Sequence, residues 1–415
     1  MKAEPRYQPL KSHNVQRKLL DDYYAEVKQA QNRGIKTCYA IGHAPTDLAV
    51  AMGFLPVYPE NHNTMCGAAQ VGAEICEVAE AHHYSIDLCS YSKCDLGSYF
   101  SGAATKSPIG GLPKPDILMA TTVCNTHLKW FEELSRIWHI PLLVLDVPYF
   151  HDGLSQEDQA AGVQYTLRQL KEEWIPFFEN YCHRPYDWDK LQECVSYTSK
   201  TGQLYAKVVN SCKNKPSPIT VFDTFLLLGT LMNLRGFPQA VNFYEQLNAE
   251  IAERVEQKFS AIGEEKYRLY FDNIPVWYKV GWFSRKFASY GACMVAAVYS
   301  LVWISCFGQE DPARPLESIA ETQFLLTTNQ GTASRINLLK QICQDFSVDG
   351  LVMQVSRTCK VFIPDQIGIM KKVQEETGLP GVIIEADMID SRFFSEKEAD
   401  TRIDSFMEIL RSRAK

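Results

Sequence analysis

The sequence lacks the features that mark nucleic-acid-binding, membrane and exported proteins. It has no run of Lys or Arg, and its formal net charge of −7 and pI near 5.8 argue against nucleic acid or an anionic membrane surface as the main partner. No apolar run approaches the roughly 18 residues that a membrane-spanning helix needs. The N-terminus, MKAEPRYQPLKSHNVQRKLL, also lacks the apolar core and small-residue cleavage site of a signal peptide. We therefore expect a cytoplasmic protein with no nucleic acid and no membrane among its partners.

Familiar cysteine and nucleotide motifs are missing too. The chain has thirteen cysteines but no C-x-x-C pair, so ferredoxin spacing is absent. An odd number of cysteines spread over 415 residues does not indicate a disulfide framework. No G-x-x-x-x-G-K-[ST] loop, the common phosphate-binding pattern, is found either. The cysteines are left as reduced thiols or metal ligands, and their positions must decide between the two.

Hydrophobic periodicity divides the chain into segments of different kinds. A length of 415 residues exceeds what one ordinary core fills and predicts two or three domains. We expect an N-terminal helical segment over 1–34, a first α/β domain over 35–155, a helical segment over 156–263 and a second α/β domain over 264–415. The predicted fold class is α/β, with two doubly wound parallel-sheet domains, a helical N-terminal segment and a helical middle layer.

Short apolar runs bounded by turn residues mark the strands of both α/β domains. In the first domain they are IKTCYAIG, LPVYP, ILMATTV and LLVLDV, and in the second YRLYFDNI, CMVAAVY, GLVMQV and GVIIEA. Continuous apolar runs of this length suit buried parallel strands, and helical spacing appears between many of them. The same architecture is thus predicted twice, although no residue-level repeat links the two halves.

Two cysteines occupy equivalent places in the two predicted domains. Cys124 follows the strand ILMATTV at the start of a helix, and Cys359 follows GLVMQV in the loop before the next helix. Ligands of open parallel sheets bind at the carboxyl ends of the strands, so both thiols should reach such a crevice. A helix N-terminus lowers the pKa of a thiol and favours the metal-binding thiolate. Cys89, ahead of a Gly/Pro-rich loop, can approach the same place.

Three thiolates from distant positions can hold a cubane iron–sulfur cluster and leave one iron open to substrate or water. Cys94, five positions after Cys89, is a possible fourth ligand or a side chain packed near the site. From spacing alone the other interpretation also stays open, namely that the three cysteines are unrelated buried or loop residues, because free cysteine is among the most buried residue types.

Several ordered motifs resemble one enzyme superfamily, the 2-hydroxyacyl-CoA dehydratases and ATP-dependent benzoyl-CoA reductases. They are YPEN, AEICEVAEAHHYSIDLCSY, TTVCNTHLKWFEELSR, KPSPI, EEKYRLYFDNIPVW, DGLVMQVSRTCK and ETGLPGVIIEADMIDSRFFS. The resemblance runs from about Ile35 to the C-terminus. It implies that Cys89, Cys124 and Cys359 ligate a 4Fe-4S cluster. It also implies an acyl-CoA thioester substrate, a related second cluster-binding subunit and an ATP-hydrolysing iron–sulfur activator that delivers low-potential electrons.

The motifs divide between the two branches of that superfamily. A histidine and a Pro-His that the dehydratases tend to carry are replaced here by Gln354 and by Ser300-Leu301, and IEADMIDSR replaces another dehydratase pattern. LDVPYFHDG, LKEEWIPFFE and IEADMIDSRFFS look more like the larger benzoyl-CoA reductase subunit. The resemblance therefore favours an oxidoreductase that reduces benzoyl-CoA to a cyclic dienoyl-CoA. A hydro-lyase that converts a 2-hydroxyacyl-CoA to a 2-enoyl-CoA, and a double-cubane electron-transfer protein, stay as alternatives.

Reduction of an aromatic ring requires a dry pocket beside the electron donor. Trp277, Tyr278 and Trp282 cluster after the strand YRLYFDNI, and we predict that the first two, with Gly42 of the loop YAIGHAP, contact the substrate. A place in the core or in a subunit interface is the alternative for these aromatic residues.

His43, in the same loop as Gly42, is the candidate proton donor because histidine titrates near neutral pH. Its alternative is a surface or capping histidine. His127, one turn after Cys124, is a candidate hydrogen-bond partner for a cluster sulfur, or else a packed helix residue. Asp387 and Asp390 follow the last strand and are expected to position Arg392 and organise the C-terminal loop.

Overall fold

A computed structural model describes residues 8–413 and contains two parallel β-sheets of four strands each. The first sheet consists of β1 (Thr37–Ala40), β2 (Leu55–Val57), β3 (Ile117–Thr121) and β4 (Leu142–Leu145). The second consists of β5 (Tyr267–Asp272), β6 (Ala292–Ala297), β7 (Gly350–Ser356) and β8 (Gly381–Ala386). Every strand pair is parallel, so the carboxyl ends of all four strands of a sheet meet at one edge.

Both sheets have the same strand order. The first is β2-β1-β3-β4 and the second is β6-β5-β7-β8, so in each the chain adds its second strand on one side of the first and its third on the other. This reversal places a crevice between β1 and β3, and between β5 and β7, where ligands of open α/β sheets bind. The predicted fold class and the predicted repetition of architecture are confirmed.

Helices cover the sheets and join them. In the first part of the chain they are α1 (Ser12–Gln29), α2 (Asp47–Ala51), α3 (Pro59–Ala68), α4 (Gly72–Ala81), α5 (Ser90–Ser101) and α6 (Asn125–Trp138). The middle part holds α7 (Gln156–Gln169), α8 (Ile175–Cys182), α9 (Trp188–Asn210), α10 (Val221–Leu234) and α11 (Pro238–Glu256). The last part holds α12 (Val280–Ala288), α13 (Val298–Phe307), α14 (Pro315–Phe324), α15 (Thr332–Asp345), α16 (Ile363–Thr377) and α17 (Glu396–Arg413).

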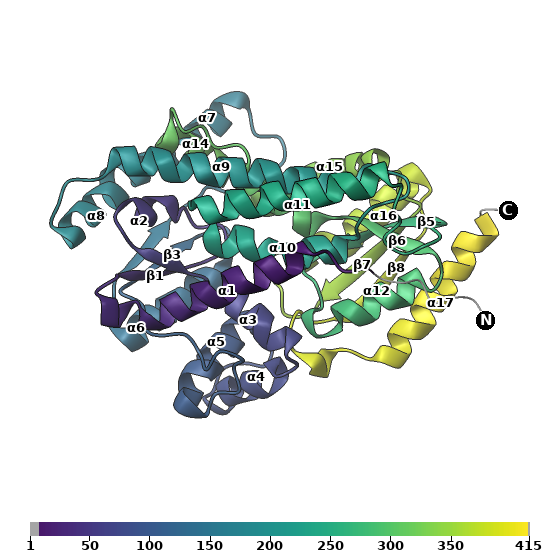
Figure 1. Ribbon diagram of the computed structural model, residues 1–415, viewed down its shortest axis with the longest axis horizontal. Helices are drawn as coiled ribbons and strands as arrows, with labels where there is room; N and C mark the ends of the chain where they lie inside the picture. The colour runs from purple at the N-terminus through teal and green to yellow at the C-terminus, as the bar shows by residue number, and fades with distance from the viewer. Residues whose placement is uncertain (1–7, 414–415) are drawn as a thin grey trace.

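The long helices of the middle part span the molecule from one sheet to the other. In Figure 1, α9, α11, α10 and α1 run side by side between the first sheet, with β1 and β3, and the second, with β5 to β8. Helix α9 packs against α2 of the first half and α13 of the second, and α10 packs against α1 and β6. The helical layer therefore fixes the position of one sheet relative to the other.

Two helices near the strand ends were not expected from the sequence. Helix α5 begins directly after Cys89, where a predicted helical stretch was expected to end, and all its residues from Ser90 to Ser98 are buried. Helix α13 begins directly after β6, inside the predicted strand CMVAAVY, and is apolar around most of its circumference. Neither helix is amphipathic, and an apolar face opposite a polar face is the pattern by which a sequence reveals a helix.

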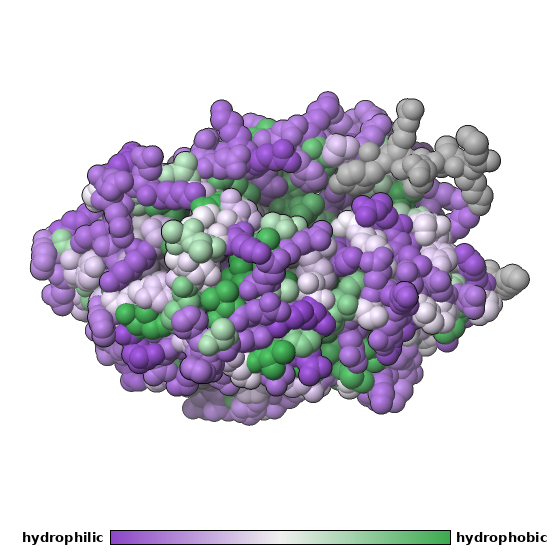
Figure 2. All heavy atoms as spheres, turned by 90° about the horizontal axis from the view of Figure 1, so that it is seen from below, coloured by the Kyte–Doolittle hydropathy of each residue, from purple (hydrophilic) through white to green (hydrophobic). Residues whose placement is uncertain are grey.

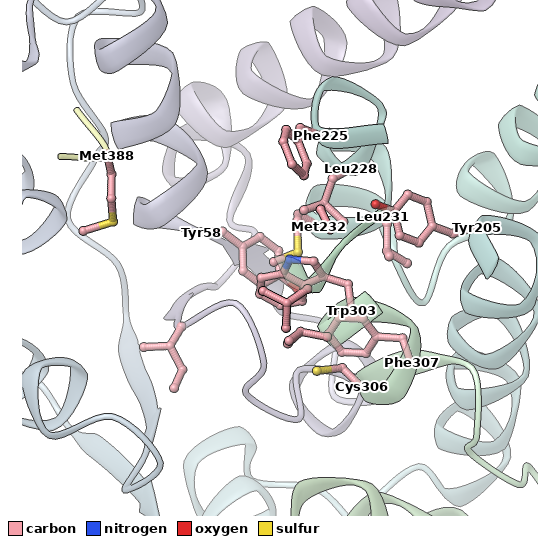
Figure 3. Packing of buried hydrophobic residues seen from close by; sticks show 14 of the residues in the cluster. Tyr58, Tyr205, Phe225, Leu228, Leu231, Met232, Trp303, Cys306, Phe307 and Met388 are labelled. Atoms are coloured by element: carbon pink, nitrogen blue, oxygen red, sulfur yellow. The ribbon is translucent and has the colours of Figure 1, made fainter. Parts of the chain in front are cut away.

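The surface of the molecule is mostly hydrophilic, and its core is apolar. In Figure 2 the face seen from below is mostly hydrophilic, with hydrophobic residues gathered in small patches. Within residues 8–413 no helix combines the length and the apolar character that crossing a membrane requires. Figure 3 shows part of the core, where Trp303 of α13 lies close to Tyr58, Met232 and Phe307.

Candidate functional site

A cavity lies at the carboxyl ends of the strands of both sheets. Its volume, counted as the space that the centre of a water molecule can occupy, is about 80 Å³. Most of its exposed wall is apolar. Its lining comprises His43, Glu60, Cys89, Tyr91, Val123, Cys124, Thr126, His127, Ile274, Tyr299, Val302, Trp303, Thr328, Cys359, Lys360, Val361, Phe362 and Met388. The cavity thus brings together loops from the two halves at the place that parallel-sheet geometry predicts.

The structure brings Cys89, Cys124 and Cys359 to this one cavity. Cys124 is the residue before the first turn of α6, and Cys89 is the residue before the first turn of α5. Cys359 lies between β7 and α16, and its N–H donates to Ser356 O over 3.0 Å. Three different connections therefore supply the three thiols, as the positions of Cys124 and Cys359 after equivalent strands predict.

The predicted lowering of the thiol pKa values is wrong. Burial raises the pKa of Cys124 to about 12, although the N–H groups of His127 and Thr126 favour its thiolate. Burial likewise raises the pKa of Cys359 against the N–H groups of Phe362 and Val361. Burial also raises the pKa of Cys89, and the nearby Cys359 and Cys124 raise it further. Desolvation outweighs the helix N-terminus here, so a metal that binds these sulfurs must displace their protons.

Within the described part of the chain, no three His, Cys, Asp or Glu side chains converge closely enough to hold a single metal ion. Cys94, the possible fourth ligand, does not line the cavity. Its thiol is fully buried and hydrogen-bonds with Cys66, whose pKa is lowered to about 5 by this bond and by His62. Cys94 therefore packs near the three cysteines without facing the same space as they do.

The two histidines near the cavity surround a carboxylate. Glu60, at the start of α3, accepts a hydrogen bond from Gly42 N over 2.5 Å and lies 3.0 Å from His127 Nε2. Burial alone would raise the pKa of Glu60, but His127 and the N–H of Gly42 lower it to about 2. His127 thus pairs with Glu60, and its Nε2 does not point at a cysteine. The ring centroids of His43 and His127 are 5.7 Å apart.

His43 occupies the predicted place after β1, but its predicted titration is wrong. The side chain is buried, and burial and the nearby His127 lower its pKa to about 3. Its Nδ1 lies 3.4 Å from Thr121 Oγ1. At neutral pH His43 therefore faces the cavity as a neutral imidazole, and its role as proton donor stays a prediction.

The loop that carries His43 is held from several sides. The buried Arg235 donates to Gly42 O over 2.6 Å and to Ala44 O over 2.9 Å, and Gln323 donates to His43 O over 2.7 Å. A Cβ on Gly42 would lie 2.6 Å from the Trp303 ring. Gly42 is therefore the residue that lets α13 approach this loop, and its N–H serves Glu60.

The aromatic residues predicted as substrate contacts lie outside the cavity lining. Trp277 is buried and donates through Nε1 to Tyr91 OH over 2.5 Å. Tyr278 OH lies 3.5 Å from Asp390 O, and Trp282 packs edge-on against Phe394. The aromatic rings that line the cavity belong to other residues, namely Tyr91, Tyr299, Trp303 and Phe362.

The aspartates after β8 organise their loop, as predicted. Asp390 accepts two hydrogen bonds from the Arg392 guanidinium, at 2.9 Å and 2.6 Å, and a third from Arg392 N at 3.2 Å. Asp387 accepts from the N–H groups of Ile389 and Asp390 and from the hydroxyl of Thr358.

Sequence reasoning missed Glu60 and the wall formed by α13. Glu60 lies in the motif YPEN, directly after β2, so the rule that selected Cys124 and Cys359 also selects this carboxylate. Tyr299, Val302 and Trp303 of α13 carried no comparable signal, because Tyr299 was assigned to the strand CMVAAVY and the residues after it were assigned to no element.

Comparison with known proteins identifies the family of the chain. Residues 42–410 match the family model for 2-hydroxyglutaryl-CoA dehydratase, D-component. A benzoyl-CoA reductase subunit of Thauera aromatica is 32% identical over 354 residues, covering 82% of this chain and 80% of its own. The lactoyl-CoA dehydratase alpha subunit of Anaerotignum propionicum is 28% identical over 398 residues, covering 93% of each chain. The (R)-phenyllactyl-CoA dehydratase alpha subunit of Clostridium sporogenes is 28% identical over 386 residues, covering 92% of this chain and 91% of its own. The chain belongs to the 2-hydroxyglutaryl-CoA dehydratase D-component family.

Proposed function

We propose that this chain is the iron–sulfur subunit of an ATP-dependent benzoyl-CoA reductase, with a 4Fe-4S cluster bound by Cys89, Cys124 and Cys359. One observation carries the proposal. Three cysteines from three separate connections, in both halves of the fold, line a single cavity at the strand ends. Such a convergence has no use in a chain whose cysteines serve only as small core residues.

The donor set suits a cluster better than a single ion. In a cubane each protein sulfur binds a different iron, so the sulfurs surround a volume and need not converge on one point. That agrees with the absence, within residues 8–413, of a group of side chains able to hold one metal ion. When bound, the cluster would supply low-potential one-electron transfer and one iron without a protein ligand.

The residues around the cysteines would control water and protons. Tyr299, Val302 and Trp303 of α13 form an apolar wall, which excludes water from a site where a reduced aromatic ring would otherwise be quenched. Glu60 is kept ionised and fixed by Gly42 and His127. His43 is neutral, and a neutral imidazole carries a proton on one ring nitrogen. That N–H could face the acyl group of the substrate.

The proposed substrate is benzoyl-CoA. The reaction adds two electrons and two protons to the ring and leaves the thioester intact. The apolar, aromatic lining of the cavity favours a flat apolar acyl group over a polar one. The 32% identity to a benzoyl-CoA reductase subunit supports the same branch. From the motif resemblance we also propose a related second cluster-binding subunit and an ATP-hydrolysing iron–sulfur activator as partners, and from the composition a cytoplasmic location.

A second candidate is a subunit of a radical 2-hydroxyacyl-CoA dehydratase, which removes water from its substrate and returns the electron that starts the reaction. Its support is the coverage of the dehydratase relatives, which match 92% and 93% of this chain against 82% for the reductase subunit. His43 and Glu60 would then face the hydroxyl group and the proton that leave as water.

The test is anaerobic purification with the co-expressed second subunit, followed by iron quantitation and turnover assays. Benzoyl-CoA and a 2-hydroxyacyl-CoA are each supplied with activator, ATP and reductant. Bound iron with formation of a dienoyl-CoA supports the reductase. Turnover of the hydroxyacyl thioester alone assigns the chain to the dehydratases, and absence of iron from the purified protein refutes both.

A further inference from the structure

One side chain links the segment that carries Cys89 to the segment that carries Cys359. The hydroxyl of Thr358 accepts a hydrogen bond from Ser90 N over 3.0 Å and donates one to Asp387 Oδ2 over 2.5 Å. Thr358 and Ser90 are both fully buried. The link joins two residues that are 268 positions apart, each directly adjacent in sequence to one of the site cysteines.

We infer that Thr358 is a positioning residue that fixes Cys89 relative to Cys359, and so sets the spacing of the cluster ligands. This inference rests on the proposed cluster at the three cysteines. It concerns the chain's own hydrogen bonds and needs no contact between Thr358 and the cluster.

A hydroxyl suits this place because it donates one hydrogen bond and accepts another. Asp387 is held by the N–H groups of Ile389 and Asp390, at 3.2 Å and 3.1 Å, so its carboxylate acts as a fixed acceptor. A hydroxyl can donate to that carboxylate and still accept from Ser90 N, whereas a methyl group can do neither. Without it, the buried N–H of Ser90 loses its acceptor, which is costly because water cannot replace the lost bond, and Asp387 Oδ2 keeps the longer bond from Thr358 N at 3.3 Å.

Helix α5 is also held by segments other than the one that carries Cys359. In its first turn Asn63 Nδ2 donates to Tyr91 O over 2.8 Å, and Cys76 Sγ donates to Ser90 O over 3.5 Å. Lys93, whose side chain is fully buried, bonds Glu80 at 2.8 Å and lies 3.5 Å from Asp390. Lys93 N also donates to Cys89 O over 3.0 Å. Loss of the Ser90–Thr358 bond would therefore leave the helix in place but remove the hydrogen bond that ties its first residue, next to Cys89, to the segment of Cys359.

The experiment compares Thr358→Val, which keeps the shape and removes the hydroxyl, with Thr358→Ser, which keeps the hydroxyl. The matched control is Thr198→Val, because the buried Thr198 donates in the same way to the buried Asp47, over 2.5 Å, without adjoining a site cysteine. Each protein is purified anaerobically with the second subunit. Iron per chain, the rate of iron loss to a chelator and the electron paramagnetic resonance spectrum of the reduced cluster are measured, together with the thermal midpoint.

We expect Thr358→Val to lose iron about tenfold faster than the parent protein, the lower end of what loss of an outer hydrogen bond costs a metal site, and to show a shifted resonance spectrum. Thr358→Ser should restore both. Thr198→Val should lower the thermal midpoint but leave iron loss and spectrum unchanged. If Thr358→Val does not fold, Asp387→Asn, which weakens the same bridge, should show the same two changes to a smaller extent.

Parent-like iron retention and spectrum in a folded Thr358→Val or Asp387→Asn protein would overturn the inference and leave the proposed function intact. Equal defects in Thr198→Val would also overturn it, because they would show a general loss of stability. A parent protein without iron would instead refute the proposed function, and the inference with it.

Discussion

The two halves share a strand order but give the cavity different chemistry. The first half supplies two of the three cysteines and both histidines, together with the carboxylate of Glu60. The second half supplies one cysteine, Cys359, and most of the apolar wall. Equivalent positions after equivalent strands have thus become a polar side and an apolar side of one cavity.

One group of polar side chains at the strand ends of the second half bonds within that half. Asp272, the last residue of β5, accepts from Tyr270 OH and from Gln366 Nε2, each over 2.5 Å, and Gln366 also donates to Gln354 O over 2.9 Å. All four side chains are buried. A satisfied network of this kind stiffens the second half without offering a proton to a substrate. The two halves therefore share the supply of thiols to the cavity, whereas the histidines and Glu60 that line it come from the first half.

The largest expected effect tests that shared requirement. Cys124→Ser and Cys359→Ser should each abolish iron binding in anaerobically purified protein, because each removes one of three ligands and a serine hydroxyl is a poor ligand for an iron–sulfur cluster. Cys94→Ser, which changes a buried thiol outside the cavity lining, is the matched control and should keep its iron. If Cys124→Ser or Cys359→Ser kept as much iron per chain as the parent protein, the two halves would not share the site.

The next effect tests how closely the apolar wall approaches the polar side. Gly42→Ala places a methyl group 2.6 Å from the Trp303 ring and 3.0 Å from Met232 Cε. Overpacking of this kind lowers the free energy of unfolding by about 1–3 kcal/mol. In a double-mutant cycle, measured by urea denaturation, Trp303→Leu should reduce the cost of Gly42→Ala.

Gly368→Ala is the control for that cycle. Gly368 lies within α16, and a Cβ there meets no atom within 4 Å. The substitution should raise the free energy of unfolding by up to about 1 kcal/mol, since alanine is the better helix former. A Gly42→Ala protein as stable as the parent would mean that the two sides of the cavity lie farther apart than the structure places them.

The sequence predicts the parts of the site that follow local rules. Each strand is a short apolar run, and Cys124 and Cys359 come directly after such runs, so the rule for parallel sheets places each at the carboxyl edge of its own sheet. The C-terminal loop was also predictable, because Asp390 and Arg392 are close in sequence. In both cases the pattern that allows the prediction is formed by residues near one another in the chain.

The parts that were missed depend on tertiary burial. Helix α5 is buried along its whole first part although it carries Lys93, whose charge is balanced by Glu80 and Asp390 from other segments. A sequence pattern cannot show those partners. The pKa of Cys124 was predicted in the wrong direction for the same reason, since a helix N-terminus is visible in the sequence whereas the depth of burial is not.

The smallest expected effect concerns acid stability and separates the polar side from the rest of the fold. The pKa of His43 is about 3 in the folded protein, lowered by burial and then by His127, against 6.5 for an unfolded chain. Below pH 6.5 the unfolded state therefore binds a proton that the folded state does not. Stability due to this group is present above pH 6.5 and falls by about 1.4 kcal/mol per pH unit as the pH decreases toward 3.

Replacement of the imidazole by an amide should remove that slope. His43→Gln should lose less free energy of unfolding between pH 6.5 and pH 5 than the parent, as measured by urea denaturation of the metal-free chain at several pH values. Glu60, whose pKa falls to about 2 from an ordinary 4.5, contributes its own acid sensitivity only below this range, so the two effects do not overlap. His151→Gln, which removes an exposed imidazole, is the control. A His43→Gln protein with the parent's slope would mean that this imidazole is hydrated and chargeable, and that the polar side of the cavity is open to water.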